Sequence, residues 1–189
     1  KVAFREGLKT IKQSAFSGCT SLTELILPES VEYIGAYAFC HYNLDNEKEV
    51  EKDEEGNYDF DDKKEPLGND TLTSVVIPDG VEYVEKYAFY NCNQLSDVTL
   101  PETCKIINTY AFAKCELLEN INFEKVQIIA DYAFYECDSL TGEDIGGINL
   151  SHVSAIGDHA FEGCRLTNVD LSNLRRVGKY AFANCNKLE

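Results

Sequence analysis

The chain has 189 residues and a formal net charge of −16, from 33 acidic and 17 basic residues. A nucleic-acid-binding protein needs a basic surface to neutralise phosphates, so this balance disfavours a nucleic-acid partner and an anionic membrane surface alike. No apolar run approaches the roughly 18 residues of a membrane-spanning helix, so we expect no membrane insertion in this segment.

An Ala-Phe pair recurs along the chain and sets its organisation. The seven pairs are Ala15-Phe16, Ala38-Phe39, Ala88-Phe89, Ala111-Phe112, Ala133-Phe134, Ala160-Phe161 and Ala181-Phe182. Successive phenylalanines are 23, 50, 23, 22, 27 and 21 residues apart, so two intervals contain an insertion. A period of roughly 20–29 residues is the signature of a leucine-rich solenoid. We therefore predict a single repeat domain over residues 1–189, with one core that grows coil by coil.

An alternating apolar segment follows each Ala-Phe pair and predicts a short strand with one buried face. In the first repeat it consists of Leu22, Leu25 and Leu27, and Pro28 ends it because proline cannot donate to a β-ladder. The equivalent segments are Leu72-Val75-Ile77, Leu95-Val98-Leu100, Leu118-Ile121-Phe123, Ile145-Ile148-Leu150 and Leu166-Val169-Leu171.

A second apolar pair comes next in each repeat and predicts a short extended segment on the opposite wall. These pairs are Val31/Ile34, Val81/Val84, Cys104/Ile107, Val126/Ile129, Val153/Ile156 and Leu174/Val177. The Tyr-Ala-Phe-x-x-Cys segment is then predicted to form one helical turn, which would place Phe and Cys on the same inward face. The predicted fold class is α/β: a right-handed leucine-rich-repeat solenoid, dominated by a parallel sheet of short strands, with one short helical turn per repeat.

Two insertions interrupt the period. The larger spans about residues 45–71, and Asp45 to Asp70 holds twelve acidic residues against four lysines, so we expect a loop that projects from the rim. The smaller spans about residues 141–145. Val2 and Leu188 lie part-way through coils without the polar capping repeats that a solenoid requires, so we expect a fragment of a longer array.

The repeated pattern Ile-Gly-x-Tyr-Ala-Phe-x-x-Cys, seen at Ile34 to Phe39 and similarly at Ile156 to Phe161, resembles the BspA-like, or type 5, leucine-rich repeat. It departs from the common leucine-rich consensus, which places Asn or Cys after the strand rather than before it. The resemblance implies a surface or secreted protein of host-associated bacteria or some protists, located extracellularly or on the cell surface. It also implies an adhesin-like role, without shared catalytic residues and without a cofactor.

Six of the eight cysteines occupy one repeat position: Cys19, Cys92, Cys115, Cys137, Cys164 and Cys185. Stacked coils would hold these side chains parallel at about 5 Å, whereas a disulfide needs facing Cβ atoms about 3.8 Å apart. We therefore predict buried free thiols, with Cys104 also in the core and Cys40 semi-exposed. A zinc site is disfavoured because no C-x₂₋₄-C pair occurs.

Catalytic and calcium sites find little support in the sequence. His159 replaces the tyrosine of the repeat, which indicates a packing role, and no oxyanion-hole motif accompanies His41 beside Cys40. We predict that the chain is not an enzyme. Asp59, Asp61 and Asp62 offer oxygen ligands that suit calcium, but they lack the EF-hand pattern, and a solvated acidic loop is the competing interpretation.

Five tyrosines precede Ala-Phe at one repeat position: Tyr37, Tyr87, Tyr110, Tyr132 and Tyr180. Their recurrence predicts an aromatic ladder along the coils. Packing between coils and carbohydrate binding both fit such a ladder.

The candidate binding surface is the concave side of the sheet, where strands present alternate side chains outward. The outward positions form two columns, Glu24, Ser74, Asp97, Asn120, Gly147 and Asn168, and Ile26, Val76, Thr99, Asn122, Asn149 and Asp170. We expect an apolar anchor at the Ile26 end and amide donors and acceptors at the other. The β-propensity of Ile and Val offers an alternative reason for the apolar positions.

These observations together predict a non-catalytic cell-surface or secreted module that recognises a protein partner, such as a host extracellular-matrix or surface protein. Two alternatives stay open at this point. One is a structural spacer in a multidomain surface protein, and the other is a carbohydrate-recognition module that supports a separate enzyme domain.

Overall fold

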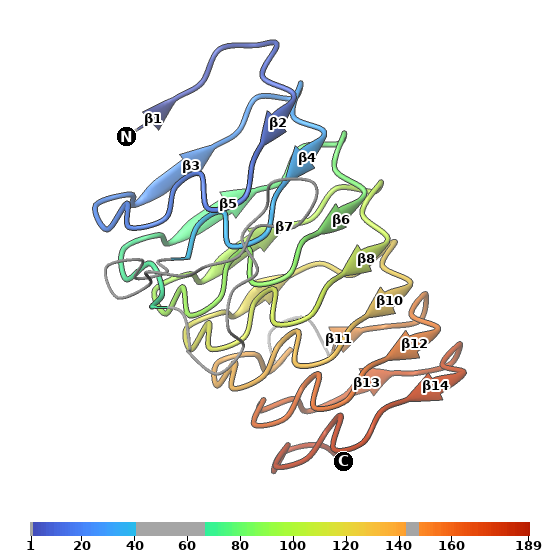
Figure 1. The fold of residues 1–189 in the computed structure, drawn as a ribbon. Helices are drawn as coiled ribbons and strands as arrows, with labels where there is room; N and C mark the ends of the chain where they lie inside the picture. The colour runs from blue at the N-terminus through green and yellow to red at the C-terminus, as the bar shows by residue number, and fades with distance from the viewer. Residues whose placement is uncertain (1, 41–66, 143–147) are drawn as a thin grey trace, which may run out of the picture.

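The computed structural model describes residues 2–40, 67–142 and 148–189, and in these ranges the chain winds as a solenoid (Figure 1). Each coil contributes one short strand to each of two walls. The first wall contains β1 (Val2–Ala3), β3 (Glu24–Ile26), β5 (Ser74–Val76), β7 (Asp97–Thr99), β9 (Asn120–Ile121), β11 (Ile148–Asn149) and β13 (Val169–Asp170). The second wall contains β2 (Thr10–Ile11), β4 (Tyr33–Ile34), β6 (Tyr83–Val84), β8 (Ile106–Ile107), β10 (Ile128–Ile129), β12 (Ala155–Ile156) and β14 (Arg176–Val177).

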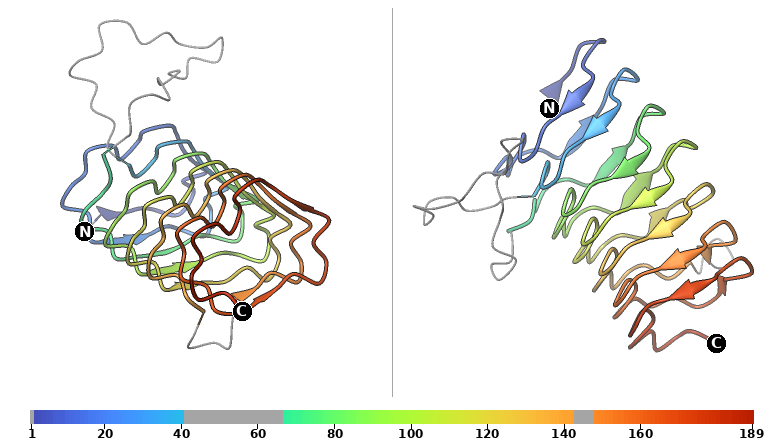
Figure 2. Two further views of the ribbon diagram at one scale, coloured as in Figure 1. Left: turned by 90° about the horizontal axis from the view of Figure 1, so that it is seen from below. Right: turned by 45° about the vertical axis from the view of Figure 1, so that its right-hand side comes forward.

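Every strand pairs in parallel with the equivalent strand of a neighbouring coil. The first wall consists of a five-stranded sheet, β1-β3-β5-β7-β9, and a pair, β11-β13. The second wall consists of a pair, β2-β4, and a five-stranded sheet in the order β6-β8-β10-β12-β14. Figure 2 shows the coils stacked along one axis, with the two termini at opposite ends of the stack. The predicted solenoid with short parallel strands is therefore confirmed.

The alternation of apolar and polar residues explains which side of each strand is buried. The central residues of β3, β5 and β7 are Leu25, Val75 and Val98, and all three are buried while their neighbours in the strand point outward. On the second wall the second residue of most strands is inward, as at Ile107 and Ile129. One face of each wall thus closes on a core shared by all the coils.

A column of phenylalanine rings runs through this core. The Phe column consists of Phe16, Phe39, Phe89, Phe112, Phe134, Phe161 and Phe182, stacked nearly parallel with centroids 5.1–5.5 Å apart. Phe39 and Phe89 stack at 5.1 Å although 50 residues separate them in sequence. The coils on either side of the large insertion therefore pack directly against each other.

The Tyr-Ala-Phe segment differs from the predicted helical turn, because the described residues contain no helix. In the coil of Phe112, the N–H groups of Ala113 and Cys115 donate to the carbonyls of Tyr110 and Phe112, which closes successive turns. Tyr110 and Lys114 adopt φ of +57° and +60°. These left-handed residues interrupt the run of right-handed φ angles that a helix requires.

Hydrogen bonds between coils hold these turns in place. The N–H of Phe112 donates to the carbonyl of Ala133 at 2.9 Å, and the N–H of Phe134 donates to that of Ala160 at 2.8 Å. The segment is thus a third ladder, built from turns, between the two walls. In the central coils its inward residues, Ala111 among them, are fully buried, whereas Phe16 and Phe182 in the terminal coils are half-buried.

The last coil departs from the predicted inward pattern. Val177 is 56% exposed and Leu174 is half-buried, whereas the equivalent Ile156 and Val153 are fully buried. Only the coil of β12 packs against β14, so Val177 is covered from one side.

Candidate interaction surface

The outward side chains of the first wall form the surface assigned to partner binding from the sequence. One column contains Glu24, Ser74, Asp97, Asn120 and Asn168, all exposed except half-buried Ser74. The other contains Ile26, Val76, Thr99, Asn122, Asn149 and Asp170, all exposed except half-buried Asn122. Strand pairing places Glu24 beside Ser74 and Ile26 beside Val76. Gly147 lies outside the described residues.

Ile26 and Val76 form an apolar pair on this surface. They are 53% and 59% exposed, and they face each other across the pairing of β3 and β5. Carboxylates of Glu24 and Asp97 lie on the same face. Burying one such side chain against a partner contributes about 1–2 kcal/mol, so the pair is a plausible anchor in energetic terms.

The amide at Asn122 is already used by the fold. Its Oδ1 accepts a hydrogen bond from the N–H of Leu100 at 2.7 Å, and its Nδ2 donates to the carbonyl of Leu100 at 2.9 Å. In the preceding coil, the equivalent N–H of Ile77 bonds the backbone carbonyl of Thr99. The Asn122 side chain therefore replaces a backbone bond where β9 ends.

Asn149 and Asp170 cap the turns that follow their strands. Asn149 Oδ1 accepts from the N–H of Ser151 at 2.9 Å, and Asp170 Oδ1 accepts from the N–H of Ser172 at 3.0 Å. Both are Asx turns. Coils that carry Ile26, Val76 and Thr99 at this position have a proline two residues later, which has no N–H to satisfy. The change from apolar to amide residues thus follows the loss of proline, and the fold itself uses part of the donor and acceptor capacity expected at this end.

The expected aromatic ladder exists and packs between coils. The Tyr column consists of Tyr37, Tyr87, Tyr110, Tyr132, His159 and Tyr180, with neighbouring rings stacked at 4.6–5.0 Å. Its rings pack against one another and, in part, against Tyr90 and Tyr135. Only the Tyr180 end, with that ring 65% exposed, offers a broad aromatic surface within the described chain. This arrangement favours the packing interpretation over a carbohydrate platform.

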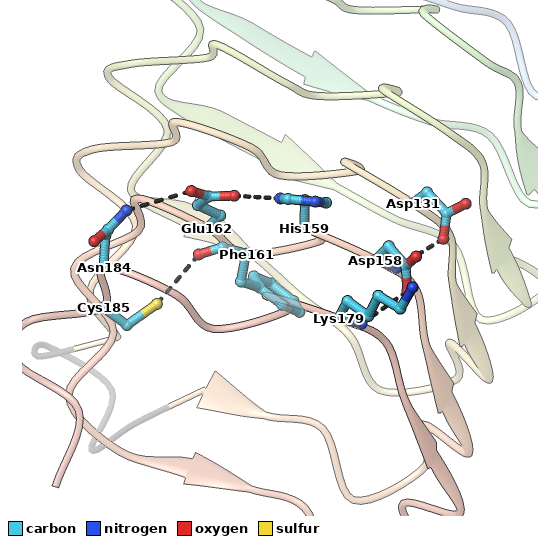
Figure 3. Close-up of polar contacts among 8 residues, drawn as sticks. All are labelled: Asp131, Asp158, His159, Phe161, Glu162, Lys179, Asn184 and Cys185. Atoms are coloured by element: carbon cyan, nitrogen blue, oxygen red, sulfur yellow. Dashed lines mark hydrogen bonds and ion pairs between the residues drawn. The ribbon is translucent and has the colours of Figure 1, made fainter.

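His159 occupies a tyrosine position of the column, and its ring points toward the carboxylate of Glu162 (Figure 3). Its ring lies 4.6 Å from that of Tyr132, and its Nδ1 pairs with the carboxylate of Glu162. Glu162 stands where the coil before has Tyr135, three residues after Tyr132. The contact of Tyr132 with Tyr135 is therefore replaced by a hydrogen bond between His159 and Glu162, and the stacking of His159 on Tyr132 agrees with the predicted packing role. His41 lies outside the described residues.

All eight cysteines lie in the described part of the chain, and all are free thiols. Cys40, expected to be semi-exposed, is fully buried beneath the Tyr column, whereas Cys19 is exposed. Four thiols donate to the carbonyl of the phenylalanine in the preceding coil, as Cys137 does to Phe112 at 3.1 Å; the other three are Cys115, Cys164 and Cys185. Burial raises the pKa of the Cys92 thiol to about 12, which keeps it protonated and unreactive near neutral pH.

A second exposed surface was not predicted. The outward residues of β4, β6, β8, β10 and β12 form the second-wall stripe: Tyr33, Tyr83, Ile106, Ile128 and Ala155. Tyr83 and Ile128 are 38% and 39% exposed. The signal in the sequence was the apolar residue before the inward Ile or Val of these five strands, which breaks the polar-outward alternation.

Metal binding finds no geometric support in the described residues. Across 2–40, 67–142 and 148–189, no three His, Cys, Asp or Glu side chains converge as a metal site. The calcium candidates Asp59, Asp61 and Asp62 lie outside these ranges, as does most of the acidic insertion. Within the same ranges, no helix is long and apolar enough to span a membrane.

Comparisons with known proteins bear on the repeat and the fold. The chain is similar to a leucine-rich cell surface protein from Faecalibacterium prausnitzii A2-165, with 30% identity over 65% of this chain and 41% of the other, at a TM-score of 0.44. The pneumococcal vaccine antigen PcpA is 23% identical over 94% of this chain and 47% of its own, with a TM-score of 0.52. A leucine-rich repeat protein of T. pallidum is 20% identical over 98% of this chain and 74% of its own, with a TM-score of 0.48. No curated protein matches the chain.

The chain spans less than half the length of the F. prausnitzii and PcpA chains. The likeness to PcpA is one of fold. Residues 1–55 and 65–189 match the family model described as the BspA type leucine-rich repeat region, in six copies. This match confirms the resemblance drawn from the Ile-Gly-x-Tyr-Ala-Phe pattern, and the chain belongs to the BspA type leucine-rich repeat family.

Proposed function

We propose that this chain is a non-catalytic, adhesin-like binding module, exposed at the cell surface or secreted, which recognises a protein partner through the outer face of the first wall. Solenoids of this family are typically non-enzymatic, and the F. prausnitzii relative is described as a cell surface protein. A host extracellular-matrix or surface protein is the partner class that suits such a location.

The observation that carries the proposal is the exposed pair Ile26 and Val76. Their neighbours Glu24 and Asp97 add carboxylates to the same face, so an apolar anchor is combined with negative charge. Interfaces of this kind gain affinity from a desolvated apolar centre and specificity from charges at the rim. Asn122, Asn149 and Asp170 then act as structural supports of the surface rather than as its recognition groups.

The test is a solid-phase binding assay of the chain against a panel of extracellular-matrix proteins. Ile26→Thr with Val76→Thr retains β-branched side chains, so the strands keep their propensity while the apolar anchor is lost. We expect affinity for the bound matrix protein to fall about tenfold or more. The matched control is Leu117→Thr, an exposed leucine outside both walls, which should leave affinity unchanged.

A spacer is the second candidate, because the uninterrupted stack of coils suits a stiff rod (Figure 2). The spacer would be favoured if this chain bound none of the extracellular-matrix proteins of the panel while the parent protein still bound one of them through other domains. Binding that survives the Ile26/Val76 change would place the site elsewhere on the molecule.

A further inference from the structure

Charged side chains are distributed unequally between the two walls of the solenoid. The first-wall side runs, in each described coil, from the residue before the first-wall strand to the turn that follows it. Its acidic residues are all exposed: Glu6, Glu24, Glu29, Asp79, Asp97, Glu102, Glu119, Glu124 and Asp170. Its lysine and arginine residues are Arg5 and Lys125. Lys1 lies outside the described residues.

The second-wall side, from the end of that turn to the residue before the Tyr column, is nearly balanced. Its acidic residues are Glu32, Glu82, Glu85, Asp131 and Asp158, and its basic residues are Lys9, Lys12, Lys86, Lys105, Arg175, Arg176 and Lys179. Lys9 also forms an ion pair with Glu32. Between the two walls, negative charge is therefore concentrated on the first, which is the face that carries the Ile26/Val76 pair.

Three of the first-wall carboxylates form what we call the acidic column: Glu29, Asp79 and Glu102. Each directly follows the proline that ends a first-wall strand. In all three coils, the N–H three residues after this proline donates to the proline carbonyl at 3.0 Å, so the three turns have the same conformation. A Cβ added to Gly80 would lie 2.7 Å from the carbonyl oxygen of Val31, which shows how closely neighbouring turns approach. The three carboxylates therefore leave the solenoid at equivalent points of successive coils.

The coils on either side of the acidic column carry a cation beside the equivalent carboxylate. Arg5 precedes Glu6 in the first coil, and Lys125 follows Glu124 in the fifth. In the three coils between them, the residues that flank the carboxylate are proline on one side and serine, glycine or threonine on the other. The acidic column therefore lacks the local charge compensation that its neighbours have.

No cation elsewhere in the described ranges compensates the column either. Glu29, Asp79 and Glu102 form no ion pair there. The nearby ammonium of Lys105 donates to the main-chain carbonyl of Glu102 at 2.9 Å rather than to a carboxylate. Equivalent positions of neighbouring parallel strands are about 4.7–4.9 Å apart, and like charges at that spacing destabilise a fold. A cationic partner would relieve this repulsion.

The acidic column lies on one side of the exposed apolar pair, and a further carboxylate lies on the other. Glu29 and Asp79 come three residues after Ile26 and Val76, which is at most about 10 Å along the chain. Asp97 belongs to the preceding outward column and accepts a hydrogen bond from Asn120 at 2.8 Å, which holds its carboxylate in place. An apolar centre is thus flanked by negative charge on both sides.

We infer that the first-wall surface binds a basic segment of its partner protein, in which an apolar side chain lies between lysine or arginine residues. The apolar side chain contacts Ile26 and Val76, and the cations reach the acidic column on one side and Asp97 on the other. This inference rests on the proposed function, because it specifies the partner of the same face. Charges at such a rim raise the association rate and make binding dependent on salt.

The test uses a labelled nine-residue peptide with three leucines between two blocks of three lysines. Its binding to the chain is followed by fluorescence anisotropy at about 50 mM salt, where surface charges are weakly screened. The column variant combines Glu29→Gln, Asp79→Asn and Glu102→Gln. We expect saturable binding to the parent and about tenfold weaker binding to the column variant, since three exposed charge pairs are lost.

The matched control removes the same charges from the turns between the walls. It combines Glu116→Gln, Glu136→Gln and Asp138→Asn, three exposed residues. Its net charge equals that of the column variant, and both keep the acidic insertion, so non-specific attraction of lysine is the same in the two proteins. We expect the control to bind the peptide within about twofold of the parent, and to lose more affinity than the column variant when salt is raised to about 500 mM.

A second peptide, with serine in place of the three leucines, separates the apolar contact from the charges. It should bind the parent about tenfold more weakly than the leucine peptide does. Ile26→Thr with Val76→Thr should weaken the leucine peptide by a similar factor and leave the serine peptide unchanged. Equal affinity of the parent for both peptides would overturn the inference, because a surface that binds only positive charge needs no apolar centre.

Equal peptide affinity of the column variant and the matched control would also overturn it. Thermal melting guards against loss of fold, because removing like charges should leave the midpoint of the column variant at or above that of the parent. Sedimentation of the chain alone would overturn the inference by showing a dimer that the column variant does not form, since a second copy would then occupy the surface.

The matrix-protein assay distinguishes failure of this inference from failure of the proposed function. Matrix binding that is lost in the Ile26/Val76 variant but unchanged in the column variant would overturn the basic partner alone. Matrix binding that survives the Ile26/Val76 change would instead overturn the proposed function. Weaker binding in both variants, with the matched control unaffected, is the result that we expect.

Discussion

The Phe column and the Tyr column run along the same wall of turns, two residues apart in every coil, yet they differ in how strictly they keep one residue type. All seven coils have Phe in the first column. The second column has Ser14 in the first coil and His159 in the sixth. Phe112 is fully enclosed, whereas Tyr110 and Tyr132 are half-buried.

Enclosure explains the difference. A ring in the Phe column contacts other rings above and below and both walls beside it, so a smaller residue leaves a cavity. Tyr37 and Tyr87 in the Tyr column are also buried, but from Tyr110 onward the column is half-buried or exposed. There a ring needs only flat neighbours for stacking, and the imidazole of His159 provides this with Glu162 as its hydrogen-bond partner. Position inside the coil, rather than aromatic stacking alone, therefore sets how much sequence variation a column accepts.

Removing one ring from each column tests this contrast most strongly. Phe112→Ala should lower the free energy of unfolding by about 3–5 kcal/mol, since the cavity lies between two coils that cannot collapse independently. Tyr110→Ala should cost only about 1–2 kcal/mol, the contribution of its stacking contacts. The φ of +57° at Tyr110 adds no cost of its own to Tyr110→Ala, because Ala and Tyr are similarly strained in the left-handed region.

Denaturant unfolding of the two variants provides the measurement, with the slopes compared as well as the midpoints. Equal losses for Phe112→Ala and Tyr110→Ala would show that the Tyr column belongs to the core in energetic terms, and the contrast between the columns would fail.

The buried thiols extend the comparison to pH. Burial raises the pKa of Cys92 to about 12 and that of Cys104 to about 11, both from an ordinary value of 9.0, so the folded state holds these protons more tightly than the unfolded state. The contribution of these two thiols to the free energy of unfolding is thus fully present below pH 9, and it is lost as the pH rises from there toward 11–12. We expect the free energy of unfolding to fall above pH 9 by up to about 1.4 kcal/mol per pH unit for each buried thiol.

Tyrosine and lysine side chains also titrate in this range, so the control must remove a thiol alone. Cys92→Ala should flatten the decline above pH 9, whereas Cys19→Ala, at the exposed position, should not change its slope. Iodoacetamide at pH 8 should label Cys19 in the folded protein and the other cysteines only after unfolding. If the free energy of unfolding declined with pH equally steeply in both variants, ionisation of the buried thiols would not be the cause of the loss of stability at high pH.

The sequence was sufficient to predict the inward half of each coil, because inward positions repeat with the period of the fold. Leu25, Val98 and Phe112 could be assigned without a structure, and the stacking of Phe39 on Phe89 across the large insertion follows from the same register. The free state of the cysteines followed from the parallel direction of side chains in stacked coils.

The turns and the outward surface could not be predicted in the same way. Tyr110 and Lys114 are left-handed because hydrogen bonds to the next coil hold them so, and no local propensity of Tyr or Lys indicates it. Cys40 is buried because the Tyr column covers it. The Asn122 amide bonds the backbone of Leu100, 22 residues away in the neighbouring coil, which a single repeat does not reveal.

Asn120 and Asn122 provide the finest test of this point, because they are two residues apart on one strand face. Asn122 satisfies both the N–H and the carbonyl of Leu100, whereas exposed Asn120 donates only to the Asp97 carboxylate at 2.8 Å. Asn122→Ala should cost about 1–2 kcal/mol of stability, since the backbone of Leu100 loses both partners. Asn120→Ala should stay within about 0.5 kcal/mol of the parent, as exposed substitutions usually do.

Asn122→Asp separates hydrogen bonding from simple loss of contact at the same position. The carboxylate still accepts from the N–H of Leu100 but cannot donate to its carbonyl, and it brings two oxygens close together without a proton between them. We therefore expect Asn122→Asp to be destabilised at neutral pH and to recover part of that loss near pH 4, where the carboxyl is protonated and can donate again. A variant as stable as the parent at both pH values would show that the Leu100 contacts contribute little, and Asn122 would return to the list of side chains available to a partner.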